Sequence, residues 1–165
     1  MRYVMRQHWL SFGDMFTIRD ENDRDAVHVR GKVFSFGDKL TLSDAAGGGE
    51  VARIEQRLLN WGPTYEIHRD GQLAAVVKKH LFTLFKTRFT VDVPGPDDLE
   101  AAGNFLQHEY AFTRGGREVA AVSKRWFSWT DTYGIDVSPG EDDVLILAAT
   151  VVIDLVSHDD NRGGD

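Results

Sequence analysis

The stretch that decides the fold is VLILAATVVIDLV, residues 144–156. It holds no turn-forming residue, and it is longer than a typical strand but shorter than the roughly 18 residues that a bilayer-spanning helix needs. The preceding SPGEDD, residues 138–143, is typical of a helix N-terminus. A helix that is apolar on all sides must be buried on all sides. We therefore predict a central helix over 142–157, with Asp154 near an end where water or a backbone group reaches it, and a frayed polar tail over 159–165.

The rest of the chain repeats one short pattern. LSFGDMF at 10–16 recurs as FSFGDKL at 34–40 and, more weakly, as LNWGPTY at 59–65, at spacings of 24 and 25 residues. Each repeat leads into a stretch with an apolar residue at every second position, which is typical of a half-buried strand. Turn-forming residues and a second strand follow, so the unit is a β-hairpin of about two dozen residues. The chain therefore contains roughly ten to twelve strands.

Two of the second strands share a pattern that ends in a basic pair. LAAVVKK at 73–79 matches VAAVSKR at 119–125. Strict alternation would place Lys78 and Lys124 in the core with the alanine and valine residues before them, where an unpaired ammonium group is very costly. We therefore predict a bulge or a strand end directly before each basic pair.

The expected number of strands leaves a space inside a barrel that the predicted helix would fill. A closed barrel of about eight strands is filled by its own side chains, whereas ten to twelve strands leave a wider interior. A helix is about 10–12 Å across, and thirteen residues make it about 20 Å long, comparable to a strand of five or six residues. We therefore predict a mainly β protein, with one domain over 1–158 folded as a closed antiparallel barrel around a central hydrophobic C-terminal helix.

Composition limits the classes of function. A chain of 165 residues without cysteine has no disulfide, no thiolate metal site and no cysteine nucleophile. Its 19 basic and 26 acidic residues give a net charge of −7, which argues against general nucleic-acid binding. The segment after Met1 is polar, unlike a secretory signal, and no apolar run is long enough to form a transmembrane segment. We expect a soluble cytoplasmic protein.

The leading candidate for a binding site is a set of basic and aromatic residues in two hairpins. Its members are Lys78, Lys79, Lys86 and Arg88, with His80 among them, and Lys124, Arg125, Trp126 and Trp129. If the two groups meet at one rim of the barrel, they attract an anionic lipid surface or a phosphate group, at about 1 kcal/mol per basic residue near a charged membrane. The alternative is that these strands carry charge on their outer positions for solubility and to protect edges.

The remaining candidates favour turns and surface side chains. The six histidines have no metal-binding spacing, and the acidic loop at 20–25 lacks the glycine and the terminal glutamate of a calcium loop. The glycines at 47–49 lead into a strand rather than a helix, so they do not form a phosphate cradle. No nucleophile elbow or catalytic triad is found. We expect no metal, no cofactor and no enzymatic activity.

Several of these segments together resemble the LURP-one-related family. The resemblance runs from Tyr3 to about His158, and it rests on the FGD repeats at 12–14 and 36–38, PTYEI at 63–67, the VA-x-V-x-K strands, WFSWTDTY at 126–133 and the closing helix. That family belongs to the tubby C-terminal-like superfamily and is distantly related to phospholipid scramblases. The resemblance implies a twelve-stranded barrel around a C-terminal helix. It implies no residue-level function, because the basic motif of tubby domains and the calcium-binding segment of scramblases have no match here.

These observations lead to one functional hypothesis and two alternatives. We expect a non-catalytic binding or scaffold module, peripheral at the membrane, that contacts anionic phospholipid headgroups. The alternative is a protein-interaction or regulatory scaffold without lipid binding, and an enzyme of unseen chemistry comes third. If the basic residues lie together in the folded protein, the lipid hypothesis is favoured. If they lie far apart, the observation that suggested lipid binding is lost.

Overall fold

The computed structural model describes residues 1–6, 15–32, 37–83, 86–126 and 131–162, with the side chains of 32, 81–83, 86 and 161–162 left out. These residues form strands and one helix, α1 (Asp143–Arg162). The strands are β1 (Arg2–Arg6), β2 (Met15–Asp20), β3 (Asp25–Lys32), β4 (Lys39–Asp44), β5 (Glu50–Gln56), β6 (Thr64–Arg69), β7 (Gln72–Thr83), β8 (Lys86–Asp92), β9 (Leu99–Asn104), β10 (Glu109–Arg114), β11 (Arg117–Ser123) and β12 (Thr132–Val137).

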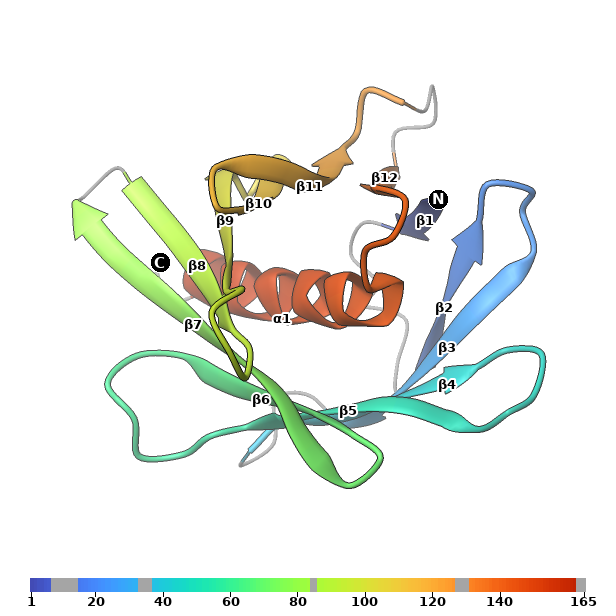
Figure 1. The fold of residues 1–165 in the computed structure, drawn as a ribbon, viewed down its shortest axis with the longest axis horizontal. Coiled ribbons are helices and arrows are strands. Elements are labelled where there is room, and N and C mark those ends of the chain that lie inside the picture. Colours follow the sequence, from blue (N-terminus) through green and yellow to red (C-terminus); the bar gives the residue numbers. More distant parts are fainter. Residues whose placement is uncertain (7–14, 33–36, 84–85, 127–130, 163–165) are drawn as a thin grey trace.

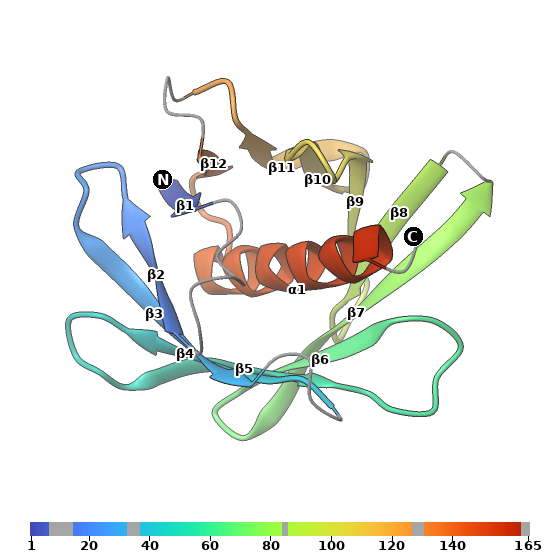
Figure 2. The ribbon, with the colours of Figure 1, turned by 180° about the vertical axis from the view of Figure 1, so that it is seen from behind.

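The strands form a closed antiparallel barrel around the helix. Each strand pairs with its neighbour in the sequence, and β12 pairs with β1 from Arg2↔Asp136 to Arg6↔Thr132, which closes the ring. Figures 1 and 2 show α1, in red, running through the middle with strands around it. The predicted fold class, a closed antiparallel barrel around a central C-terminal helix, is confirmed.

Alternation of apolar and polar residues builds the wall. In β4, Leu40 and Leu42 are buried inside the barrel, whereas Lys39 is exposed and Thr41 between the two leucines is half-buried. In α1 every residue from 145 to 156 is buried, so the helix is enclosed on all sides as its sequence requires. Burial of each leucine, isoleucine or valine contributes roughly 1.5–3 kcal/mol, which makes this helix a large part of the core.

The prediction of a break before each basic pair is right for one pair and wrong for the other. Strand β11 ends at Ser123, directly before Lys124. Strand β7 instead continues through its basic pair to Thr83. Its irregularity lies near its start, where Ile67 pairs with Ala75 and His68 with Leu73, so that Ala74 has no partner in β6. After this bulge the strand alternates with the opposite phase to the expected one: Ala75 and Val77 are buried, and Lys78 lies on the outer face.

The helix is longer than predicted at its C-terminus. The sequence indicated a helix over 142–157 and a frayed tail from 159, but α1 continues to Arg162. The last turns are polar, and they have a partner on the wall: Lys79 points inward from β7 and donates a hydrogen bond to Asp160. A charged contact between wall and helix therefore extends the helix beyond its apolar part.

The alternating strand directions place the connections at two opposite rims. The helix-start rim comprises the turns at 21–24, 45–49, 70–71, 93–98 and 115–116, together with the link at 138–142 into α1. The helix-end rim comprises residues 37–38 before β4, the segment 57–63 between β5 and β6, the turn 105–108 between β9 and β10, residues 124–126 after β11 and residue 131 before β12. In Figure 1 the segment 57–63 projects on the side where α1 ends. The two rims differ in chemistry, as described below.

Candidate functional site

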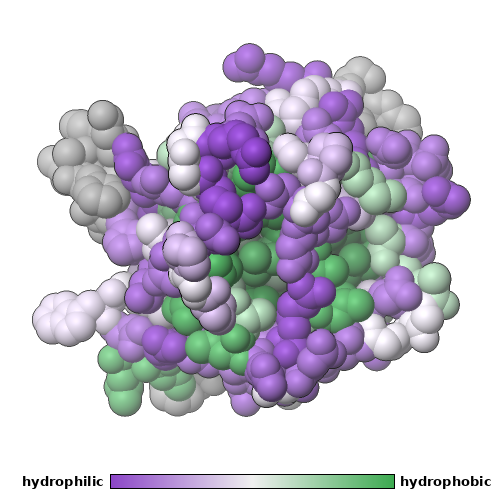
Figure 3. All heavy atoms as spheres, in the orientation of Figure 1, coloured by the Kyte–Doolittle hydropathy of each residue, from purple (hydrophilic) through white to green (hydrophobic). Residues whose placement is uncertain are grey.

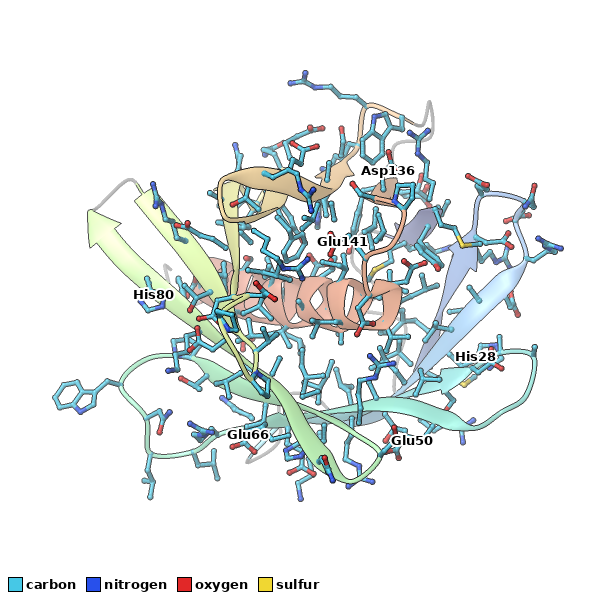
Figure 4. All side chains as sticks on the ribbon, in the orientation of Figure 1. His28, Glu50, Glu66, His80, Asp136 and Glu141 are labelled. Carbon is cyan, nitrogen blue, oxygen red and sulfur yellow. The ribbon has the colours of Figure 1, made fainter. Side chains whose placement is uncertain are left out.

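The first half of the predicted basic set lies on the outer wall and is paired with acids. Lys78 Nζ lies 3.2 Å from Asp92 Oδ2 of β8, and Arg88 Nη1 lies 2.6 Å from Glu100 Oε1 of β9. Exposed pairs of this kind contribute about 0–1 kcal/mol each, so they mainly cancel charge. The neighbouring His80 hydrogen-bonds Thr90 Oγ1 at 2.9 Å (Figure 4). Lys79 belongs to the interior contact with α1 and is nearly buried. The Lys86 side chain lies outside the described residues.

The second half of the set follows the end of β11. Glu109 of β10 accepts hydrogen bonds from the Ser123 hydroxyl at 2.9 Å and from the backbone N–H of Lys124 at 3.0 Å, which fixes the chain where the strand ends. Arg125 Nε lies 3.8 Å from the same carboxylate. The Trp126 ring stacks under the Arg2 guanidinium, 4.5 Å from the ring centroid. Trp129 lies outside the described residues.

The structure does not bring these two halves together among the residues it describes. Strands β8, β9 and β10 separate β7 from β11 in the barrel, which is roughly 19 Å along the wall at about 4.8 Å per strand. Lys78, Lys79, Arg88 and Arg125 each face a carboxylate. The basic residues therefore lie toward one end of the barrel but on different sides of it, and they do not form a single pocket for one headgroup.

Inside the barrel, a polar cluster surrounds Asp154. The Tyr133 hydroxyl of β12 donates a hydrogen bond to its Oδ2, and His108 Nδ1 lies 3.5 Å from its Oδ1. The His108 ring stacks on the Tyr133 ring, with centroids 4.2 Å apart. The expectation that water or a backbone group meets Asp154 is wrong, because its partners are two side chains: Tyr133 from β12 and His108 from the turn 105–108 at the end of the barrel where α1 ends.

Buried tyrosines supply the donors for such acids. Burial and the neighbouring Asp154 raise the pKa of Tyr110 well above its ordinary value. Burial also raises the pKa of Tyr65, and its hydroxyl donates to Asp38 at 2.9 Å. Both phenols therefore stay protonated at neutral pH. The Tyr65 hydroxyl satisfies the buried Asp38, as the Tyr133 hydroxyl does for Asp154.

The helix-start rim is held by acids. Arg114 of β10 pairs with Glu141, and Arg69 of β6 pairs with Asp142. Asp142 also caps the helix, because its Oδ1 accepts the backbone N–H of Leu145 at 3.1 Å. Figure 4 shows Glu141 above the start of α1. These acids anchor the helix and make this rim acidic.

One cluster on the outer wall has metal-ligand chemistry. Glu55 of β5 pairs in register with Glu66 of β6, and His68 lies two residues further on the same face, with ligand atoms of all three within 4.8 Å of one another. However, Arg57 Nε donates to Glu66 Oε1 at 2.9 Å. Hydrogen bonds from Arg57 and from His68 lower the pKa of Glu66. The ion pair with Arg57 thus accounts for this cluster without a cation.

Sequence reasoning missed the most exposed apolar residues of the described structure. The Leu59 and Trp61 side chains are fully exposed, at 103% and 104% of their reference areas, and Leu58 beside them is also exposed. In Figure 3 apolar side chains, in green, lie at the lower left edge of the molecule, over the β5–β6 segment. The stretch 59–65 was interpreted only as an echo of the repeat. The available signal was an apolar LLNW run beside a Gly-Pro turn.

A pocket of about 480 Å³ opens beside the last turns of α1 at the helix-end rim. It is lined by Thr87, Gly103, Asn104, Phe105, Leu106, Ser157 and Asp160. Of these, Asp160 is already bound to Lys79.

Comparison with known proteins assigns the chain to a family. The model of the LURP-one-related family matches residues 1–154. The chain belongs to the LURP-one-related family. It is 33% identical over 156 residues to YxjI of Bacillus subtilis, described as an uncharacterized protein, and the match covers 94% of this chain and 93% of YxjI. The crystal structure of an Arabidopsis thaliana protein has the same fold, with a TM-score of 0.66 and 19% identity, over 98% of this chain and 91% of that one.

The LURP-one-related membership confirms the resemblance inferred from the sequence. Neither the family description nor these relatives carry an activity, a substrate or a partner, and they fit a non-catalytic module. Within the described residues, no helix has the length and apolarity needed to cross a bilayer.

Proposed function

We propose that this LURP-one-related protein is a non-catalytic binding module that docks on an anionic phospholipid surface through its helix-end rim. The basic residues of β7, β8 and β11 do not converge, so the proposal rests on the helix-end rim as a whole. A single headgroup needs a pocket in which cations converge, but a planar membrane contacts a whole rim. Basic residues spread around one rim therefore suit a surface rather than a point ligand.

The filled interior supports a role without catalysis. Residues 145–156 of α1 are buried inside the barrel, so the lumen has no room for a substrate. The buried acids Asp38 and Asp154 are bonded to tyrosine hydroxyls. The Ser123 hydroxyl lies beside the Glu109 carboxylate, but the same carboxylate also accepts the backbone N–H of Lys124, so this contact fixes the end of β11. Binding must therefore use the outside of the barrel.

The observation that carries the proposal is the contrast between the two rims. The helix-start rim bears acids in four of its six connections, with Arg24 as the one basic residue among them: Glu21, Asp23, Asp70, Asp97, Asp98, Glu141 and Asp142. At the helix-end rim, Arg57 is the charged residue of segment 57–63, the turn 105–108 has no acid, and Lys124 and Arg125 follow β11. This rim has fewer acids among the described residues: Asp38 is buried and bonded to Tyr65, Asp160 is bound to Lys79, and Asp131 and Asp159 are the others. With a net charge of −7, the protein is repelled from an anionic membrane in most orientations. The helix-end rim is the side that such a membrane attracts.

Two arginines of similar exposure, one on each rim, allow a matched test. Arg125 at the helix-end rim is 85% exposed and Arg117 near the helix-start rim is 78% exposed, and each lies 3.8 Å from one glutamate. Arg125→Glu and Arg117→Glu change the net charge by the same amount. At about 1 kcal/mol per basic residue near the surface, we expect Arg125→Glu to weaken binding about 5- to 30-fold, and Arg117→Glu to change it less than about twofold.

The measurement is co-sedimentation with vesicles of phosphatidylcholine alone or with 30 mol% phosphatidylserine, at rising salt. We expect binding that needs phosphatidylserine and that weakens with salt, because the attraction is screened. Equal losses in both variants would show a response to net charge alone and would refute the assigned rim. Absence of binding at low salt would leave the protein-interaction scaffold as the better interpretation.

A further inference from the structure

The segment 57–63 at the helix-end rim presents an apolar tip. We name the side chains of Leu58, Leu59 and Trp61 the apolar tip. Leu59 and Trp61 are as exposed as in an extended peptide, which is unusual for large apolar residues of a folded protein. Exposed clusters of this kind mark a contact with another molecule or a membrane.

The base of this segment is fixed, so the apolar tip is held away from the barrel. The backbone N–H of Arg57 donates to Thr64 O at 2.8 Å, and that of Lys79 donates to Pro63 O at 3.4 Å. The Arg57 guanidinium also holds Glu66. Leu59 and Gly62 have φ angles of 65° and 83°, so the chain bends twice within four residues. The shape is a narrow convex projection with a firm base.

We infer that the apolar tip inserts into the interfacial layer of an anionic bilayer, an inference that rests on the proposed function. A convex tip has no surface in which a peptide could lie, whereas it can enter a fluid layer between headgroups. Tryptophan suits that layer, because its ring is apolar and its N–H is polar. The charge of the segment does not oppose insertion: no acid lies from 57 to 65, and its one charged residue, Arg57, is paired with Glu66. An anionic headgroup layer therefore meets no negative charge on the segment that carries the apolar tip.

Truncation of the apolar tip gives the first test. Leu59→Ser and Trp61→Ser each remove apolar area that enters the bilayer, and we expect each to weaken co-sedimentation by about tenfold. Because both side chains are fully exposed, these variants should fold and unfold like the parent chain. The matched control is Leu73→Ser, which removes a 43% exposed leucine near the helix-start rim and should leave binding unchanged.

A single-cysteine probe gives the decisive test, since the chain contains no cysteine. Leu59→Cys and Leu73→Cys are each labelled with the environment-sensitive fluorophore NBD and mixed with vesicles containing 30 mol% phosphatidylserine. We expect a blue shift, a rise in intensity and quenching by nitroxide-labelled lipid for the probe at 59, and no change for the probe at 73. Co-sedimentation is measured on the same samples.

The outcomes separate the two proposals. Vesicle binding with an unchanged probe at 59 would overturn insertion and leave the proposed function in place. No vesicle binding would overturn the proposed function and the insertion with it. A probe at 59 whose emission shifts with protein concentration in the absence of vesicles would show that a second copy covers the apolar tip, which also overturns insertion. Equal shifts at 59 and 73 would indicate unfolding on the vesicle and would contradict insertion at this rim.

Discussion

Removal of one hydroxyl group from the barrel interior tests how the central helix is held. Tyr133→Phe deletes the donor to Asp154 Oδ2 and leaves a buried carboxylate with one hydrogen bond fewer. Hydrogen bonds to charged groups contribute about 1.5–3 kcal/mol to stability, so we expect the free energy of unfolding to fall by that amount. For a chain of this length, that corresponds to a decrease in Tm of about 3–12 °C.

The reciprocal change and the double variant complete the cycle. Asp154→Leu removes the carboxylate but leaves the Tyr133 hydroxyl buried without its acceptor, so it should also destabilise. The double variant Tyr133→Phe/Asp154→Leu replaces both polar partners by apolar groups, and such replacement can be nearly neutral. We therefore expect the double variant to be more stable than the Asp154→Leu single variant, with a coupling energy of about 1–3 kcal/mol.

Urea unfolding followed by far-UV circular dichroism measures these values. The m-value should be the same in all four proteins, because the surface exposed on unfolding is the same. Purely additive effects of the two substitutions would refute the argument, since they would show that Tyr133 and Asp154 do not stabilise the barrel through their shared hydrogen bond. A Tyr133→Phe variant as stable as the parent chain would refute it as well.

Two further predictions concern alkaline pH and a close backbone approach. The pKa values of Tyr3, Tyr65 and Tyr110 are raised in the folded protein, so the unfolded chain loses these phenolic protons first and stability should fall as pH rises above about 10. Absorbance at 295 nm should show their ionisation only together with unfolding, and ionisation in the folded state would contradict this. Gly103→Ala would place a Cβ 2.6 Å from the backbone of β10 at a φ of 142°, so it should lower Tm by several degrees, whereas Gly49→Ala, which faces open space, should not.

The fold was predictable because its helix and strands follow from patterns of apolar residues within short segments of the sequence. The helix follows from an apolar run that must be buried on every side, and the strands follow from alternation with a period of two. The bulge at Ala74 was not predictable, because pairing with β6 places it and no residue of β7 itself marks it. The partners of Asp154 could not be predicted from the sequence either, since Tyr133 and His108 come from different parts of the chain.

The candidate site was harder to predict than the fold. The basic residues of β7 and β11 were identified as a set from their shared pattern, but each meets a carboxylate on an adjacent strand or on α1, as Lys78 does with Asp92 and Lys79 with Asp160. Such pairing depends on strand register, which a repeat pattern does not contain. Exposure of Trp61 depends in turn on how far the 57–63 segment projects, and that is decided by its hydrogen bonds to Thr64 and Lys79.

The acids of α1 also explain how an apolar helix acquires one orientation inside a barrel. A helix that is apolar on every side packs almost equally well in any rotation about its axis. Asp143 and Asp154 are eleven residues apart, which is close to three full turns, so they lie on one face. Their donors, Tyr3 and Tyr133, belong to β1 and β12, the two strands whose pairing closes the barrel. Any other rotation removes these partners from the buried Asp154 carboxylate and from the two buried phenols, at about 1–3 kcal/mol for each group, and breaks the contact of Tyr3 with the half-buried Asp143. The same two hydrogen bonds therefore set the rotation of the helix and hold it against the seam where the first and last strands meet.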